Sequence, residues 1–157
     1  MQLDVDLQRA CEADVPDEEQ IHLWVLKTLV STNYSFDAEI TVRIVDAETI
    51  QQLNSRYRHK DKATNVLSFP FEIPLGLSRE DVGGLLGDLV ICADIVDEEA
   101  VQQGKLKQAH WAHMVIHGCL HLLGYDHIKE QEAIKMEALE IDLLSSLGYA
   151  NPYAENS

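Results

Sequence analysis

The sequence predicts an α+β fold in which a mixed, mostly parallel four-stranded sheet is flanked by about five helices. Three observations lead to this fold class. Strand and helix patterns alternate through the first hundred residues, which is typical of strands joined by crossover helices. The remainder of the chain carries only helical patterns. The length of 157 residues and the apolar content of 46% fit one domain, so we expect residues 1–157 to form a single unit.

The first half of the chain supplies two strand–helix pairs. Residues 2–7 alternate weakly between apolar and polar side chains, and residues 39–45 are β-branched with period two, so both segments read as strands. Either Asp14 or Asp17 can cap the helix that follows the first strand. That helix is expected to begin near Pro16, and a second helix of about ten residues is expected from Ala47.

The second half begins with two strands and ends in three helices. Pro70 interrupts the first of these strands, which predicts an edge position because proline cannot donate a ladder hydrogen bond. Five glycines and prolines between residues 74 and 87 indicate a loop. The expected elements are strands over 65–71 and within the stretch GDLVICAD, and helices over 95–103, 107–123 and 129–147.

Charge and cysteine content narrow the class of protein. The formal net charge is -15, which argues against wrapping duplex DNA. Three cysteines without paired spacing predict reduced thiols in a cytoplasmic protein. The sequence contains neither a run of 18 apolar residues nor a signal-like N-terminus, so we expect no membrane association.

One short segment departs from the acidic average. Arg56, Arg58, Lys60 and Lys62 are four of the twelve basic side chains, and His59 lies among them. Such a run can be a solvated face, or it can bind the phosphates of a nucleic acid. The residues alone leave both interpretations open.

Five of the seven histidines fall between residues 110 and 127, in the region of the long helix. His117 and His121 are four residues apart, so their imidazoles share one helix face and can reach one ion. Gly124 can take a left-handed conformation just past the helix end and fold the chain back. His127 is then placed to complete a three-histidine site, which leaves one coordination position open, as in a catalytic zinc site.

Other residues near this cluster have more than one interpretation. His110 and His113 are expected to be ordinary core or surface residues, although His113 and His117 form a competing pair one turn earlier. Cys119 is expected to pack on the far side of the helix. Asp126 either accepts a hydrogen bond from a ligand histidine or caps the turn.

The segment HGCLHLLGYDH resembles the signature of the YbeY family of bacterial metal-dependent endoribonucleases, H-G-x-L-H-L-x-G-Y-D-H, at every fixed position. A second block of that family, Y-R-x-K-D-x-x-T-x-V-L-S-F-P, is matched by residues 57–70. Two departures are Ala63, where proline is common, and Asn65, where aspartate is common. They leave the three histidines intact and put a role for position 65 in doubt.

The resemblance implies single-strand-specific cleavage of RNA during ribosomal RNA maturation and ribosome quality control. It implies one Zn²⁺ per chain, with Ni²⁺ or another divalent metal as alternatives, because three imidazoles suit several ions. Arg58 then stabilises charge on the phosphorus centre, and Lys60 and Lys62 bind flanking phosphates. The nucleophile is either a water molecule at the metal or the 2′-hydroxyl of the RNA.

The histidine spacing is also similar to the metzincin protease motif H-E-x-x-H-x-x-G-x-x-H, which suggests a zincin-like fold. In those proteases a glutamate after the first histidine is the general base. Gly118 occupies that position here, so peptide hydrolysis by that mechanism is not supported. Fold similarity alone therefore does not decide the reaction.

Three functions remain open at this stage. The favoured one is the endoribonuclease, with single-stranded rRNA and the small ribosomal subunit or its assembly proteins as partners. The alternatives are a metallohydrolase of a non-RNA substrate and a ribosome-assembly factor with a structural metal. The acidic last helix is either a solvated face or a docking face for basic proteins; its acidic residues are Glu130, Glu132, Glu137, Glu140 and Asp142.

Overall fold

The computed structural model describes residues 2–78, 80–126 and 128–154. The elements follow the predicted order of strands and helices, with a 3-10 turn added before the last strand. The strands are β1 (Leu3–Arg9), β2 (Ala38–Val45), β3 (Val66–Pro70) and β4 (Leu85–Cys92). The helices are α1 (Glu18–Ser31), α2 (Ala47–Arg58), α3 (Ala93–Gln102), α4 (Lys107–Leu122) and α5 (Glu130–Ser146), and the 3-10 turn η1 spans Glu80–Val82.

The four strands form one mixed sheet in the order β1-β2-β4-β3. β1 pairs with β2 and β2 with β4 in parallel, whereas β3 pairs with β4 antiparallel. The expected α+β class and mostly parallel sheet are therefore confirmed. β3 is the last strand in this order and is therefore an edge strand, as Pro70 predicted. Pro70 is the last residue of β3 and lies opposite Gly87.

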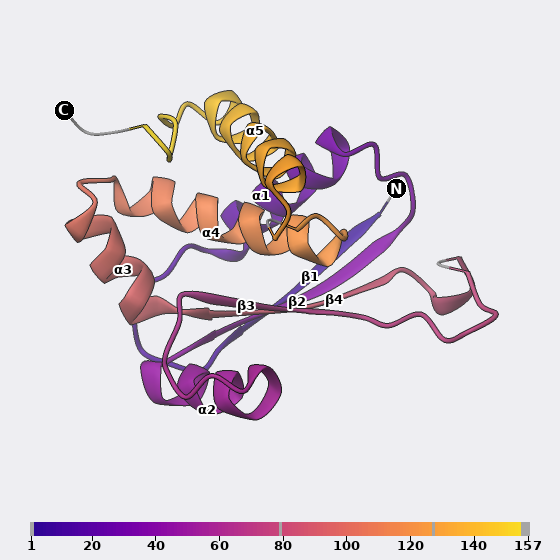
Figure 1. The fold of residues 1–157 in the computed structure, drawn as a ribbon, viewed down its shortest axis with the longest axis horizontal. Coiled ribbons are helices and arrows are strands. Elements are labelled where there is room, and N and C mark those ends of the chain that lie inside the picture. The colour runs from indigo at the N-terminus through magenta and orange to yellow at the C-terminus, as the bar shows by residue number, and fades with distance from the viewer. Residues whose placement is uncertain (1, 79, 127, 155–157) are drawn as a thin grey trace.

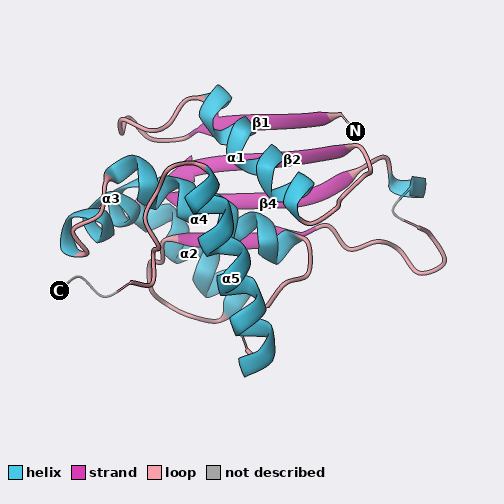
Figure 2. Cartoon of the chain, turned by 90° about the horizontal axis from the view of Figure 1, so that it is seen from above, coloured by secondary structure: helices cyan, strands magenta, loops and turns pink. Residues whose placement is uncertain are grey.

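Helices cover the two faces of the sheet unequally (Figure 1). α1, α4 and α5 lie on one face, and their apolar side chains join the inward residues of the strands in one large core. α2 lies on the other face over a smaller core that includes Val45, Ile50 and Leu67. From above, α4 is seen to cross the sheet with α5 packed over it (Figure 2).

Local capping explains where the early helices begin. Asp17, rather than Asp14, caps α1: its carboxylate accepts from the backbone N–H of Gln20 at 2.9 Å, and the Gln20 side chain accepts from the N–H of Asp17. Asp46 caps α2 by accepting from the N–H of Thr49 at 2.8 Å. These contacts satisfy backbone donors that the first helical turn leaves without partners.

Two expected boundaries were wrong. The loop was placed over residues 74–87, but β4 already begins at Leu85 and Gly87 pairs within the sheet. The helix expected from Ile95 begins at Ala93 and follows β4 directly, with Cys92 as the residue that precedes it. Both differences arise because β4 is longer at its start and runs into α3 without a connecting loop.

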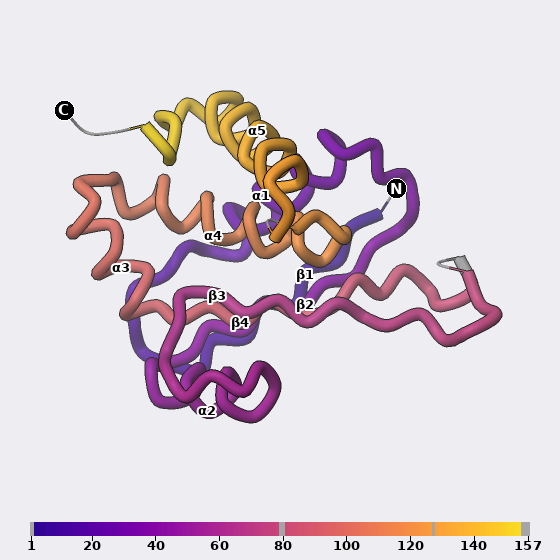
Figure 3. Tube along the Cα trace, viewed as in Figure 1, coloured from indigo at the N-terminus to yellow at the C-terminus, as the bar shows by residue number. Residues whose placement is uncertain are grey.

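Two segments leave the layered body of the fold. The connection between β3 and β4 extends beyond the end of the sheet, and the chain after α5 turns back toward the first half of α4 (Figure 3). Tyr153 in this C-terminal segment contacts the ring of His113 on α4, with ring centres 5.5 Å apart. Within the described residues, no helix combines the length and the apolar character needed to cross a membrane.

Candidate active site

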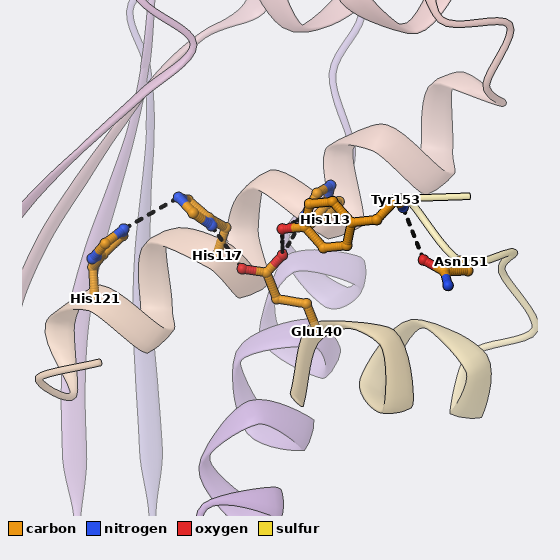
Figure 4. A network of polar contacts seen from close by, with 6 residues as sticks. All are labelled: His113, His117, His121, Glu140, Asn151 and Tyr153. Atoms are coloured by element: carbon orange, nitrogen blue, oxygen red, sulfur yellow. Dashed lines mark hydrogen bonds and ion pairs between the residues drawn. The ribbon is translucent and has the colours of Figure 1, made fainter. Parts of the chain in front are cut away.

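α4 brings two of the predicted metal ligands together. His117 and His121 project from successive turns, and their Nε2 atoms are 3.2 Å apart (Figure 4). Two ligand nitrogens at about 2.0–2.1 Å from one tetrahedral ion would be separated by about 3.3 Å. The two imidazoles are therefore already arranged as two ligands of a single ion would be.

The turn after α4 has the geometry expected from its glycine. Gly124 has φ +97°, and its N–H donates to the carbonyl of His121 at 3.0 Å. The N–H of Tyr125 donates to the carbonyl of Leu120 at 3.0 Å, which completes a Schellman motif. The predicted third ligand, His127, lies outside the described residues, so the three-histidine set stays a prediction.

Arg58 lies across the edge strand from these histidines. It is the last residue of α2, and its guanidinium donates to the carbonyl of Ser68 on β3. Its Cζ atom lies 5.3 Å from the centre of the Phe69 ring. These two contacts anchor one side of an otherwise exposed guanidinium.

A cleft of about 740 Å³ joins the basic segment to the histidines. It runs between the end of α2, strand β3 and the end of α4. The predicted site residues that line it are Arg58, Lys60, Lys62, His117, His121 and Asp126. The fold thus gathers residues from two segments that are about sixty positions apart in the sequence.

A carboxylate on α5, that of Glu140, contacts the predicted ligand His117. Its Oε1 atom lies 2.7 Å from Nδ1 of His117, and the side chain is completely buried. The sequence predicts that Glu140 lies on the acidic face of the last helix, where it is either solvated or part of a docking face. This prediction was wrong for Glu140, because its side chain is buried. A signal was present, because Glu140 lies on the same helical stripe as Met136, Leu143 and Leu144, which are also buried.

The other oxygen of Glu140 has two partners of its own. Oε2 lies 2.5 Å from Nε2 of His113 and accepts a hydrogen bond from the hydroxyl of Tyr153. Burial would raise the pKa of Glu140, but the hydrogen bonds from His113, His117 and Tyr153 outweigh it and hold the pKa at about 2. Glu140 is therefore a buried, ionised hydrogen-bond acceptor.

The contacts of Glu140 also test the alternative in which His113 and His117 bind the metal. His113, His117 and Glu140 offer ligand atoms that lie within 4.8 Å of one another. However, the carboxylate oxygens are only 2.5 and 2.7 Å from the two imidazole nitrogens, which are hydrogen-bond distances and shorter than the separation of two ligands on one ion. The geometry therefore favours a hydrogen-bonded network over an ion at this position.

His110 and Asn65 belong to a second, partly buried network. Nε2 of His110 lies 3.0 Å from Oε1 of Glu99, and the Asn65 amide donates to the two Glu99 oxygens at 3.1 and 3.3 Å. Burial lowers the pKa of His110, which favours its neutral form. The departure at position 65 thus has a structural reason, since an aspartate there would face the Glu99 carboxylate.

Gly118 has no room for a side chain. A Cβ atom there would lie 2.8 Å from Cδ2 of Leu89 and 3.3 Å from both Ser68 Oγ and Val66 Cγ2. The carbonyl of Gly118 accepts from the Ser68 hydroxyl at 3.1 Å. A glutamate at this position would have to displace the Leu89, Ser68 and Val66 side chains, so the close contact between α4 and the sheet disfavours the metzincin base.

Cys119 is fully buried on the opposite side of α4, as expected, and burial raises its pKa to about 12. Cys92 is also buried, and Cys11 is half-buried; all three are free thiols. A thiol with so high a pKa is neutral and unreactive at ordinary pH. Cys119 therefore contributes packing behind the histidines rather than a further ligand.

Comparison with known proteins places the chain in a family. The family described as Endoribonuclease YbeY matches residues 6–148. An Endoribonuclease YbeY from Pseudomonas putida (strain W619) is 54% identical over 154 residues, covering 98% of this chain and 95% of the relative. The solution structure of TM1509 from Thermotoga maritima shares the fold, with a TM-score of 0.57 and 23% identity over 98% of this chain and 100% of that one. The family match and the close relative show that this chain belongs to the YbeY family of endoribonucleases.

Proposed function

We propose that this protein is a single-strand-specific, metal-dependent endoribonuclease of ribosomal RNA maturation and ribosome quality control, formed by one domain over residues 1–157. Family membership makes it a hydrolase of phosphodiester bonds within RNA. The observation that carries the proposal further is the cleft itself, which places Arg58 and the converging Nε2 atoms of His117 and His121 in one cavity.

His117, His121 and His127 are the residues that would hold the metal. Three neutral imidazoles suit Zn²⁺, and Ni²⁺ or another divalent ion is a chemical alternative. A cation held there supplies positive charge that polarises a phosphoryl oxygen and lowers the pKa of a water molecule. We also propose that the fold around this metal site is zincin-like.

Arg58 would bind the non-bridging oxygens of the scissile phosphate. One of its five N–H donors is used by the Ser68 carbonyl, and a cation–π contact with the Phe69 ring adds a second point of attachment. The remaining donors can form the two parallel hydrogen bonds that a phosphate accepts. Charge that develops on the phosphorus centre is then met by a guanidinium already held in place.

Lys60 and Lys62 line the same cleft and would contact phosphates on either side of the cut. Asp126 also lines it and retains the two roles expected for it, as acceptor for a ligand histidine or as cap of the turn. A cleft with a few cations fits a flexible single strand better than a rigid duplex.

The net charge of -15 limits how tightly the isolated protein can hold RNA. We therefore propose that the substrate is presented in the cytoplasm by the small ribosomal subunit or its assembly proteins. Strong, salt-insensitive binding of free RNA by the isolated protein would contradict this part of the proposal.

The test is cleavage of single-stranded rRNA fragments by metal-loaded protein, compared between the wild type and the His121→Ala and Arg58→Glu variants. His121→Ala is expected to lose both metal and cleavage, whereas Arg58→Glu loses cleavage at unchanged metal content. Arg56→Glu is the matched control, because Arg56 lies on the same helix but outside the cleft. Equal cleavage by wild type and His121→Ala would contradict the proposed site. Full cleavage by Arg58→Glu would favour a different hydrolase chemistry, and no cleavage by any sample would favour an assembly factor.

A further inference from the structure

The network behind His117 extends to the C-terminal segment of the chain. Glu140 is 0% exposed and has contacts with His113 and His117 on α4 and with Tyr153 after α5. Figure 4 shows these side chains converging on the carboxylate from both elements. Glu140 is not among the described residues that line the cleft. It therefore affects the site through its neighbours or serves only in packing.

The two nitrogens of His117 face different partners. Nδ1 lies 2.7 Å from a carboxylate oxygen of Glu140, and Nε2 lies 3.2 Å from Nε2 of His121. An ionised carboxylate only accepts hydrogen bonds, so Nδ1 carries the proton and the lone pair of a neutral His117 is on Nε2. This is the tautomer that can bind an ion on the side of His121.

Glu140 is itself fixed in orientation. The His113 imidazole contacts Oε2 at 2.5 Å, and the Tyr153 hydroxyl donates to the same oxygen. Tyr153 is placed by the bond from its backbone N–H to Oδ1 of Asn151 at 2.8 Å and by its edge-to-face contact with His113. Each oxygen of the carboxylate is thus directed by at least one named donor.

Packing alone does not explain a carboxylate here. Glu140 occupies a helical stripe with Met136, Leu143 and Leu144, where an apolar side chain would fill the same space. An ionised carboxylate is costly to bury unless its hydrogen bonds are satisfied. Two of its contacts go to imidazoles on α4, and one of these, His117, is a proposed metal ligand.

We propose that Glu140 is a positioning residue that fixes the tautomer and ring orientation of His117, and that Tyr153 holds Glu140 so that the C-terminal segment tunes metal affinity. The inference rests on the proposed metal site and deepens it. Carboxylates that orient ligand histidines typically contribute 10–100-fold to metal affinity.

The first experiment measures the Zn²⁺ dissociation constant of the full chain by competition with a chromophoric chelator. Glu140→Ala and Glu140→Gln are expected to weaken affinity by about 10–100-fold. Tyr153→Phe is expected to weaken it by a smaller factor of about three, because His113 still holds Oε2. Glu132→Gln on the exposed side of α5 and Tyr149→Phe are the matched controls and should bind Zn²⁺ as the wild type does.

The second measurement detects the tautomer directly. In metal-free protein above the histidine titration range, long-range ¹H–¹⁵N spectra should show His117 protonated at Nδ1 in the wild type. Glu140→Ala should shift His117 toward a mixture of tautomers. A merely structural role for Glu140 would change the melting temperature without changing this spectroscopic signature.

The outcomes separate this inference from the proposed function. Unchanged Zn²⁺ affinity and an unchanged tautomer in a folded Glu140→Ala variant would overturn the inference. If neither Glu140 variant folds, Tyr153→Phe decides: weaker binding supports the inference and unchanged binding overturns it. Wild-type affinity in His121→Ala would instead show that the metal site itself is misplaced.

Discussion

The two walls of the cleft are built in opposite ways. On the α4 side, His117 is backed by the fully buried carboxylate of Glu140 from α5, whose other partners are His113 on α4 and Tyr153 in the C-terminal segment. On the α2 side, Arg58 is exposed and anchored by a backbone carbonyl and an aromatic ring. The histidine wall is thus supported from within the core, whereas the cationic wall rests on the surface of an edge strand.

This difference suggests a division of labour between the two walls. Buried, hydrogen-bonded side chains are preorganised and keep a metal site at fixed geometry. The exposed lysines on the α2 side, Lys60 and Lys62, are flexible and screened by salt, which suits a strand that must enter and leave. If the division holds, changes on one wall should leave the property of the other wall intact.

The largest effect on activity is expected from removing the guanidinium alone. Arg58→Ala should lower kcat by about 10²–10³-fold, the range for losing one preorganised charge donor in a transition state. Zn²⁺ affinity should stay at the wild-type value because Arg58 contacts β3 and not the histidines. Single-turnover cleavage and chelator competition on the same preparation measure the two properties. Loss of Zn²⁺ binding in this variant would show that the walls are not independent.

The next largest effect is expected on stability, from adding a side chain where α4 contacts the sheet. Gly118→Ala adds a Cβ atom 2.8 Å from a Leu89 methyl and 3.3 Å from two β3 side-chain atoms. Overpacking of this kind costs about 1–3 kcal/mol, partly offset by about 1 kcal/mol of helix propensity. We expect urea unfolding to give a net loss of up to about 2 kcal/mol.

The control for Gly118→Ala is Ala112→Gly, which changes propensity in a buried part of the same helix without adding volume. Its loss should follow from helix propensity and a small cavity. A Gly118→Ala variant more stable than the wild type would contradict the expected overpacking. It would show that the neighbouring side chains on β3 and β4 can make room for a side chain at position 118.

The two walls also differ in how far the sequence could predict them. The i, i+4 spacing of His117 and His121 and the turn at Gly124 are local features, and the structure has both. The edge position of β3 was predicted from Pro70, and the cap of α1 was narrowed to Asp14 or Asp17, of which Asp17 is the cap. Local periodicity and backbone preferences act within a few residues, so they are legible in one sequence.

Contacts between distant segments could not be predicted from local sequence patterns. Glu140 is 23 residues from His117, and its burial depends on how α5 packs over α4. The bond between Asn65 and Glu99 likewise depends on strand order, which the sequence pattern did not specify. The position of Glu140 within an apolar stripe was a signal that could have indicated its burial, but it could not have indicated the partner.

A smaller effect is expected from a substitution in the turn that ends α4. This substitution tests whether His127 is the third metal ligand. In Gly124→Ala the new Cβ meets nothing within 4 Å, so the cost comes only from φ +97° and should be about 1 kcal/mol. If this turn delivers His127 to the ion, Zn²⁺ binding should weaken more than the stability loss explains. Calorimetric titration with Zn²⁺ and thermal unfolding together separate the two. Unchanged affinity would contradict the predicted role of the turn.

The smallest effect is expected from the lysines of the cationic wall. Lys60→Ala and Lys62→Ala should each raise KM by a few-fold at low salt and leave kcat nearly unchanged, because flanking phosphates are bound equally before and during cleavage. Each lost phosphate contact should also reduce the slope of log affinity against log salt by about 0.7 for a single strand. Arg56→Ala, on α2 but outside the cleft, should leave both slope and KM unchanged. A fall in kcat for either lysine variant would mean that the lysine acts on the scissile phosphate, and the assignment of that role to Arg58 alone would have to be revised.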